Sequence, residues 1–173
     1  MRMKRIAYIL LFSLLLISCG TRSGYFKMEG RFLHMNQGEL YVYSPDGGIA
    51  GLDTIKIEAG RFSYEKPCSK PSTLIIIFPN YSTQPIFAES GEAVEVKADA
   101  SHLKEMEVEG TEDNELMTKF RKQIASVSPP EELKYAIAFI KDHPESAVSA
   151  YLLNRYLVQT ESPDYKQAAK LLP

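Results

Sequence analysis

The chain has 173 residues, a formal net charge of −2, 45% hydrophobic residues and 24% charged residues. This composition is typical of a folded globular protein and excludes a largely disordered chain. Because the charges nearly balance and no basic tract accompanies the aromatic residues, no nucleic-acid partner is expected.

Residues 1–19 have the pattern of a bacterial export signal. Three of the first five residues are basic, and an almost unbroken apolar run follows over residues 6–17. That run is too short to span a bilayer, which needs about 20 apolar residues. It ends in Leu16-Ile17-Ser18-Cys19-Gly20, which resembles the lipobox of bacterial lipoproteins. The alternatives are an ordinary signal peptide, or a short anchor helix, with an incidental cysteine.

The lipobox predicts that Cys19 is acylated, with chains such as palmitate, and becomes the first residue of the mature protein. Firm anchoring needs two or more chains, each buried methylene adding roughly 0.8 kcal/mol. Residues 20–24 would form a short tether. No acidic residue follows Cys19 directly, and resemblance to known sorting rules then favours the outer membrane. The expected location is therefore the cell envelope, facing the periplasm or the cell surface, with membrane lipid as the partner of Cys19.

Residues 25–110 carry short runs of β-type sequence, about ten positions apart and separated by Gly and Pro turns. The expected strands are 26–29, which Gly30 interrupts, 40–43, 53–58, 61–64, 74–78, 86–89 and 94–96. Turns at Ala59-Gly60 and Ser90-Gly91 predict two hairpins, joining 53–58 to 61–64 and 86–89 to 94–96. This pattern predicts an antiparallel β-sandwich or a small barrel.

After Gly110 the hydrophobic period becomes helical. Thr111, Ser128, Ser146 and Ser162 are the expected helix starts, and Ser128 has a proline and a glutamate at capping-box positions. The first helix is predicted to bury Leu116, Met117, Phe120 and Ile124. The fold class is therefore α+β, with a β domain at 25–110 followed by a short helical C-terminal tail at 111–173.

The tail helices carry many apolar side chains, and two arrangements are open. They leave an apolar surface for a partner or a second copy, or they fold back on the sheet and complete its core. The side chains concerned are Val148, Tyr151, Leu152, Tyr156, Leu157, Ala168, Ala169, Leu171 and Leu172.

No group of residues has the spacing of a catalytic or metal site. His34, His102 and His143 lie far apart in the sequence and in different predicted elements. The glycines of the segment 46–51 precede a strand and not a helix, which indicates a plain turn instead of a phosphate loop. The acids between Glu105 and Glu115 are expected to form a solvated face. The chain is therefore predicted to have no cofactor and no metal, and not to be an enzyme.

Cys68 is the only thiol left in the body if Cys19 carries lipid, so neither an intrachain disulfide nor a Cys-x-x-Cys pair can form. Lys66 and Lys70 stand beside it and could lower its pKa, which would make it a redox thiol. The alternative is an unreactive loop or core cysteine.

Six short motifs of the body resemble a known family. The mature chain is similar to an N-terminal domain of unknown function that precedes AhpC/TSA-type, thioredoxin-like domains in lipoproteins of anaerobic Gram-negative bacteria. The residues that carry the resemblance are 28–30, 39–43, 52–54 running to 59–62, 87–91, 108–111 and 139–146.

The resemblance implies a membrane-anchored, non-catalytic lipoprotein with a binding or scaffolding role. Similar proteins continue into a thioredoxin-like domain with a Cys-x-x-Cys or peroxidatic cysteine, which this sequence does not contain. The thiol chemistry of the family is therefore not carried over. The alternative function is an accessory subunit that docks a separate thioredoxin-like protein of a thiol-disulfide or peroxidase system. A truncated form of a longer thioredoxin-like lipoprotein is also left open.

Overall fold

A computed structural model describes residues 21–171 of the chain. The predicted signal peptide, with Cys19, and the first tether residue lie outside the described residues. The strands are β1 (Tyr25–Leu33), β2 (Gln37–Tyr43), β3 (Leu52–Glu58), β4 (Arg61–Pro67), β5 (Ser72–Ile77), β6 (Thr83–Ala88), β7 (Ala93–Asp99) and β8 (Glu107–Glu109). The helices are η2 (Leu103–Glu105), α2 (Glu112–Ile124), α3 (Pro129–Asp142), α4 (Ala147–Leu153), η3 (Asn154–Val158) and α5 (Tyr165–Leu171).

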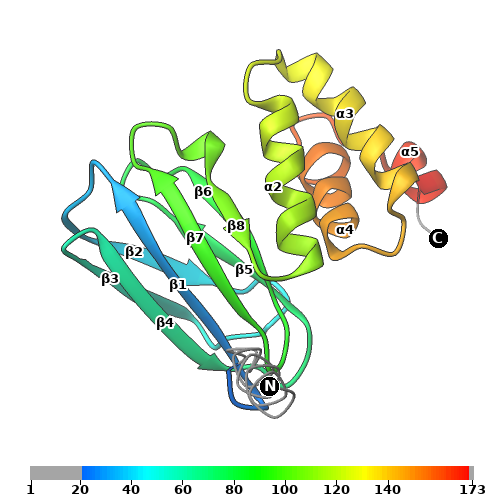
Figure 1. Ribbon diagram of the computed structural model, residues 1–173. Coiled ribbons are helices and arrows are strands. Elements are labelled where there is room, and N and C mark those ends of the chain that lie inside the picture. Colours follow the sequence, from blue (N-terminus) through cyan, green and yellow to red (C-terminus); the bar gives the residue numbers. More distant parts are fainter. Residues whose placement is uncertain (1–20, 172–173) are drawn as a thin grey trace, which may run out of the picture.

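The eight strands form one sheet in the order β6-β5-β2-β3-β4-β1-β7-β8. The sheet curls on itself like a nearly closed barrel, and helices α2 to α5 gather at one side of it (Figure 1). Neighbouring strands are antiparallel except β1 and β7, which are parallel. The predicted α+β class, with a sandwich or small barrel and C-terminal helices, is confirmed. The division into a domain at 25–110 and a tail at 111–173 remains a prediction.

One predicted hairpin is confirmed and the other is wrong. Ala59 and Gly60 both have positive φ, 50° and 72°, as a tight turn between antiparallel strands requires, and they connect β3 to β4. β6 and β7 do not pair as a hairpin, because β6 pairs with β5 and β7 lies parallel to β1. The connection binds to β1 instead: Gly91 N–H donates to the carbonyl of Tyr25 at 2.8 Å.

Gly30 does not interrupt a strand, contrary to the sequence prediction. It lies inside β1, where a Cβ atom would stand 2.8 Å from the Phe62 ring and would overlap the carbonyl oxygen of Val96 on β7. A glycine is needed there because the backbones of β1 and β7 and the Phe62 ring approach closely.

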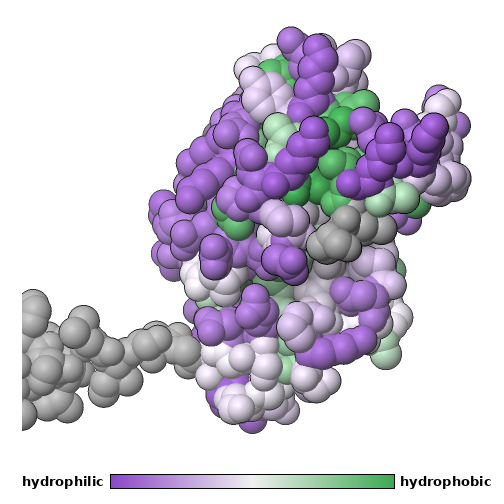
Figure 2. Space-filling model, turned by 90° about the vertical axis from the view of Figure 1, so that its right-hand side faces the viewer, coloured by the Kyte–Doolittle hydropathy of each residue, from purple (hydrophilic) through white to green (hydrophobic). Residues whose placement is uncertain are grey.

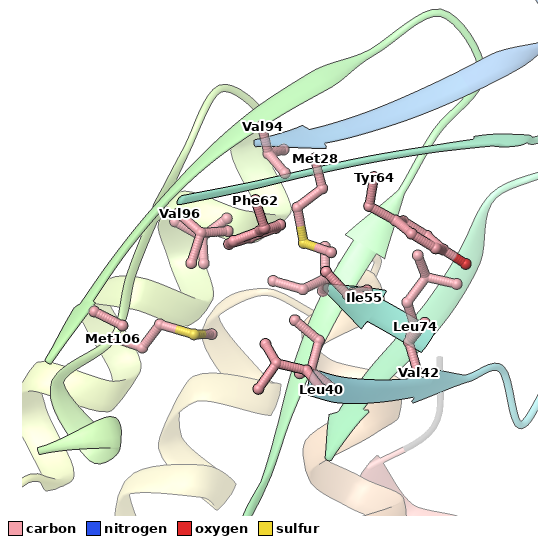
Figure 3. Close-up of a cluster of buried hydrophobic side chains, with 14 of the residues drawn as sticks. Met28, Leu40, Val42, Ile55, Phe62, Tyr64, Leu74, Val94, Val96 and Met106 are labelled. Atoms are coloured by element: carbon pink, nitrogen blue, oxygen red, sulfur yellow. The ribbon is translucent and has the colours of Figure 1, made fainter. Parts of the chain in front are cut away.

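The interior of the sheet is a continuous apolar core. It is built from alternate residues of the strands, because successive side chains of a strand point to opposite faces. Figure 3 shows ten of these side chains converging: Met28, Leu40, Val42, Ile55, Phe62, Tyr64, Leu74, Val94, Val96 and Met106. Burying one large apolar side chain stabilises the fold by roughly 1.5–3 kcal/mol. This cluster therefore supplies most of the stability of the sheet.

The helices form a second, smaller core. Its members are Phe87, Met117, Phe120, Ala136, Phe139, Ile140, Val148 and Leu152. The sheet contributes a single side chain to it, that of Phe87 on β6. The second core thus differs from both arrangements considered for the tail, since the helices bury their apolar side chains mainly against one another.

Several tail residues expected on an open surface are buried. Val148 and Leu152 are 0% exposed and Leu157 is 2% exposed. Ala169 is exposed, and Leu172 lies outside the described residues. Some hydrophobic side chains are still visible over the helices on one face of the molecule, whereas most of that face is polar (Figure 2).

The helix starts predicted at Thr111, Ser128 and Ser146 are confirmed in position, with different capping contacts. The fourth is not at Ser162, because α5 begins at Tyr165 and Asp164 accepts from Gln167 N–H at 2.8 Å. Glu131 accepts hydrogen bonds from the backbone and the hydroxyl of Ser128, at 3.4 and 3.0 Å. The Ser146 hydroxyl accepts from Val148 N–H at 3.1 Å. Thr111 stands at the N-cap of α2 without a side-chain cap bond. Within residues 21–171, no helix has the length and apolar character needed to cross a membrane.

Candidate functional site

Helix α2 buries a polar stripe that the sequence analysis missed. Asn114, Thr118 and Arg121 recur at a spacing of four and three residues and are 0%, 8% and 3% exposed. This spacing places them on one face of the helix. The apolar positions were assigned with partial success: Met117 and Phe120 are buried, whereas Leu116 and Ile124 are only partly buried.

The first two residues of the stripe bind the strands at the two edges of the sheet. Asn114 accepts from Phe87 N–H at 3.0 Å and donates to its carbonyl at 2.7 Å, on β6. The Thr118 hydroxyl accepts from Val108 N–H at 2.8 Å and donates to its carbonyl at 2.9 Å, on β8. No described strand pairs with these outer edges of β6 and β8. The helix therefore satisfies backbone groups that a closed barrel would satisfy with a strand.

We call this contact between α2 and the outer edges of β6 and β8 the seam. Arg121 completes it and bonds to both edges. Its Nη2 donates to the carbonyl of Pro85 at 2.8 Å, its Nη1 to the carbonyl of Met106 at 3.4 Å, and its Nε to the side-chain oxygen of Gln84 at 2.8 Å. Among residues 21–171, no carboxylate forms an ion pair with it. Burial lowers the pKa of Arg121 to about 10, so the guanidinium is still charged at neutral pH.

A cavity of about 330 Å³ opens beside Arg121, between the edge of the sheet and the helices. A cavity of this size suits a small molecule. It is lined by the turn after β5, the start of β6, and residues of α2, α4 and η3. The lining residues are Tyr81, Ser82, Thr83, Gln84, Lys104, Met117, Phe120, Arg121, Ile124, Ala125, Glu132, Tyr151, Leu152, Arg155 and Tyr156.

The cavity is more cationic than anionic. Lys104, Arg121 and Arg155 line it, against the single carboxylate of Glu132. That carboxylate accepts a hydrogen bond from the Tyr156 hydroxyl at 3.0 Å. Burial, with Glu132 as a second cause, raises the pKa of Tyr156 to about 12, so this phenol stays neutral and able to donate.

A second hollow of about 450 Å³ extends the cavity along the outside of the sheet. The two share Thr83, Tyr151, Arg155 and Tyr156. The second hollow adds Tyr43 of β2. We call the two hollows together the groove, which is lined by several tyrosine side chains and by the buried Arg121.

The predicted redox residue, Cys68, lies elsewhere, in the apolar core of the sheet. It is 6% exposed, and its thiol donates to the carbonyl of Lys70 at 3.2 Å. Burial raises the pKa of Cys68, opposite to the effect expected from the neighbouring lysines. Lys66 is paired with Asp53 at 2.6 Å instead. The structure therefore favours the core-cysteine alternative for Cys68.

Two of the histidines are closer in space than their sequence positions suggested, which corrects the expectation that all three lie apart. His34 Nδ1 lies 2.9 Å from one oxygen of Asp99, and His102 Nδ1 lies 3.9 Å from the other. Hydrogen bonds from Ser101 and from His34 hold the pKa of Asp99 well below its usual range. His143 stands at the C-terminal end of α3, against the Phe139 ring. No group of three or more possible metal ligands occurs in residues 21–171.

The glycine-containing segment is a turn, as predicted. The Ser44 hydroxyl accepts from Gly48 N–H at 2.8 Å, and Asp46 accepts from Thr73 N–H at 2.6 Å. The first bond closes the turn, and the second fixes it to the start of β5.

The acidic stretch forms surface pairs. Lys97 lies 3.0 Å from Glu109, and Lys122 lies 2.5 Å from Glu107. Exposed pairs of this kind contribute little stability.

A search of curated proteins finds no match to this chain. A family model does match. The family described as "Domain of unknown function (DUF4369)" covers residues 26–117, which is more than half of the chain. The matched segment begins in β1 and ends within α2, so it includes Asn114 but stops before Thr118 and Arg121. This chain forms an eight-stranded, barrel-like sheet whose two edges are joined by a polar face of α2. Since the family model covers more than half of it, the chain belongs to the DUF4369 family of domains of unknown function.

Proposed function

We propose that the protein is a cell-envelope lipoprotein, anchored by acylated Cys19, whose body binds a small molecule in the groove without transforming it. The observation that carries the proposal is the groove itself, where a buried guanidinium and several phenols face one space. No histidine or cysteine is among the described residues that line it. The Ser–His and Cys–His pairs that most often activate a nucleophile are therefore not formed among these residues, and the Glu132 carboxylate is hydrogen-bonded to the Tyr156 hydroxyl.

The proposed anchor would hold the body close to the lipid. An extended residue spans at most about 3.6 Å, so the tether 20–24 reaches roughly 18 Å. The start of β1 lies at one end of the sheet, whereas helices α2 to α5 lie along its side (Figure 1). A molecule in solution could then reach the groove while the protein stays on the membrane.

The anchor is tested by labelling growing cells with an alkyne fatty acid. The wild-type protein should be labelled and should sediment with membranes, whereas Cys19→Ala should lose the label. Cys68→Ala is the matched control and should be labelled like the wild type. Equal labelling of wild type and Cys19→Ala would refute lipidation at this residue.

The binding role is tested on the body from residue 20 onward by protein-observed NMR with a library of small neutral, anionic and cationic fragments. Fragments that bind should shift the signals of groove residues such as Thr83 and Arg155. Ala125→Trp, which fills the cavity from the C-cap position of α2, should abolish those shifts while the rest of the spectrum is kept. Shifts that are spread over the surface, or that survive Ala125→Trp, would contradict the proposal.

A second function, docking of a thioredoxin-like protein, is favoured by an exposed patch on the outer face of the sheet. Tyr41 and Tyr43 of β2 are 43% and 37% exposed, and Leu52, paired with Tyr43, is 61% exposed. Adjacent exposed apolar side chains often mark interaction surfaces. The resemblance to domains that precede thioredoxin-like domains supplies the partner class.

The docking function is tested by titrating a thioredoxin-like protein from the same organism into the body and measuring heat. Binding that Leu52→Glu abolishes would support docking through this patch. An unchanged affinity in Leu52→Glu, or no heat with the wild type, would remove it.

A further inference from the structure

We propose that the groove takes a small organic anion, with its acidic group against Arg121 and Arg155 and its flat apolar part along the tyrosines. This inference rests on the proposed binding function and adds the class of ligand. The acidic group can be a carboxylate, a sulfonate or a phosphate ester, since all three offer oxygens to a guanidinium.

The first argument is the missing counter-charge of Arg121. Its side chain is 3% exposed, and within the described chain its partners are two backbone carbonyls and the Gln84 amide oxygen. Moving a charge out of water is costly, and neutral acceptors offset only part of that cost. An anion in the cavity would supply the missing charge in a place where water does not screen it.

The second argument is that Arg121 keeps donors to spare. A guanidinium has five N–H donors. The hydrogen bonds of Arg121 to described residues engage one donor on each of its three nitrogens. Two donors are therefore left for a ligand, which matches the two-pronged contact that arginine makes with an acidic group. Arg121 can thus bind an anion without giving up the bonds that close the seam.

The third argument is the charge around the opening. Arg155 and Lys104 line the same cavity, and both are exposed to solvent. The one carboxylate present, that of Glu132, is engaged by the Tyr156 hydroxyl. Positive charges that converge on one cavity attract anions into it. The same cluster would disfavour a cationic ligand.

The fourth argument concerns the apolar part of the ligand. Tyr43, Tyr151 and Tyr156 line the groove, and Tyr81 is 88% exposed beside it. Tyr81 stands in a turn with a left-handed backbone, φ 63°, which is costly for a residue with a side chain. Tyrosines that present ring faces and hydroxyls to a groove suit a flat ring or an apolar chain. The expected ligand is therefore an anion with such a body.

The test uses two fluorescent probes that share an aryl-naphthylamine body and differ in charge. 8-Anilinonaphthalene-1-sulfonate is anionic, and N-phenyl-1-naphthylamine is neutral. The folded body from residue 20 onward should bind the sulfonate with a stoichiometry of one. Its affinity for the neutral probe should be at least about tenfold weaker, since a charge-assisted hydrogen bond is worth about that much.

Two variants at the opening carry the charge test. Arg155→Gln and Lys104→Gln should each weaken sulfonate binding by a factor of about three to ten, with no change for the neutral probe. Lys119→Gln removes the same charge from an exposed position of α2 outside the groove and is the matched control. Arg121→Gln should lose still more affinity, and its folding is checked by circular dichroism because Arg121 also closes the seam.

The outcomes separate this inference from the binding function on which it rests. Equal or tighter binding of the neutral probe, if Ala125→Trp abolishes it, would keep the binding function and overturn the anionic ligand. Sulfonate binding that Arg155→Gln and Lys104→Gln leave unchanged would also overturn it. Binding of neither probe would count against the groove as a binding site at all.

Discussion

The inside of the sheet and the seam along α2 bury their residues in opposite ways. Inside the sheet, strand backbones bond to one another, so the side chains between them can be wholly apolar, as Leu40 and Val42 are. Along the seam, the outer edges of β6 and β8 meet a helix instead of a strand. A helix uses its own backbone bonds internally. The edge groups must therefore be satisfied by side chains, here by Asn114, Thr118 and Arg121.

The difference shows where this fold can carry a site. A purely apolar interior packs densely and leaves no room for a ligand. A seam held by long polar side chains leaves hollows beside them, and the cavity at Arg121 is such a hollow. The groove is thus a consequence of how the sheet is closed.

The largest expected effect is in the sheet core. Leu40→Ala should lower the free energy of unfolding by about 2–5 kcal/mol, since the leucine is 0% exposed and leaves a cavity. Chemical denaturation followed by circular dichroism measures the change. Leu52→Ala, on the exposed outer face of the neighbouring strand, is the control and should cost less than about 1 kcal/mol. Similar losses in both variants would show that the sheet interior is not the main source of stability.

A smaller loss, confined to one region at first, is expected at the seam. Asn114→Leu should cost about 2–4 kcal/mol because both backbone groups of Phe87 lose their partner in a buried place. Hydrogen exchange should speed up in β6 and α2 before the rest of the sheet is affected. Gln123→Leu, at an exposed position of α2, should leave exchange unchanged. Uniform acceleration over all strands would mean that the seam is not a separate unit.

A pH effect should distinguish the two regions on the alkaline side. Burial, with Glu132 as a second cause, raises the pKa of Tyr156 to about 12, above the value near 10 of an unfolded tyrosine. Its contribution to stability is complete below pH 10 and is lost as the pH rises toward 12, because the unfolded state releases its proton first.

Tyr156→Phe should therefore flatten the decline of unfolding free energy between pH 10 and 12. Tyr64, in the sheet core, also has a raised pKa through burial. Its contribution starts to be lost at the same pH, near 10, so Tyr64→Phe should also flatten the decline from there. Denaturant titrations over this range provide the measurement. A slope that neither substitution changes would contradict the assigned causes.

The smallest effect is expected at Cys68, which lies in the sheet core. Its buried thiol should react with an aromatic disulfide reagent far more slowly in the native protein than in denaturant. Cys68→Ser should alter stability by about 1 kcal/mol or less, since a hydroxyl can keep the bond to the Lys70 carbonyl.

The body from residue 20 onward should neither reduce insulin disulfides nor consume peroxide. Peroxide consumption that disappears in Cys68→Ser would show that this thiol is functional after all.

The sequence predicted most of the strands and helices because their signals are local. Alternation along 53–58, the Ala59-Gly60 turn and the Ser128 helix start each depend on neighbouring residues, and each lies where it was expected. The partner of β7 was not predictable in this way. The Ser90-Gly91 turn looks like a hairpin locally, but β1, more than sixty residues away, binds the connection and sets β7 parallel to itself.

The candidate site was missed for a related reason. Asn114, Thr118 and Arg121 do lie on one helical face, and this spacing could have been noticed in the sequence. A polar stripe on a helix is ordinarily a solvated face. Only the approach of β6 and β8, from distant parts of the chain, turns that stripe inward.

The sequence by itself therefore determined the α+β class, the turns and most of the element positions, since these follow from backbone preferences and hydrophobic period. Only the tertiary structure decided that α2 closes the sheet and that a groove lies beside Arg121. It also buries Arg121 with no carboxylate of residues 21–171 paired to it. The physical reason is that strand edges must bond to something, and which residues meet them depends on contacts between segments far apart in the chain.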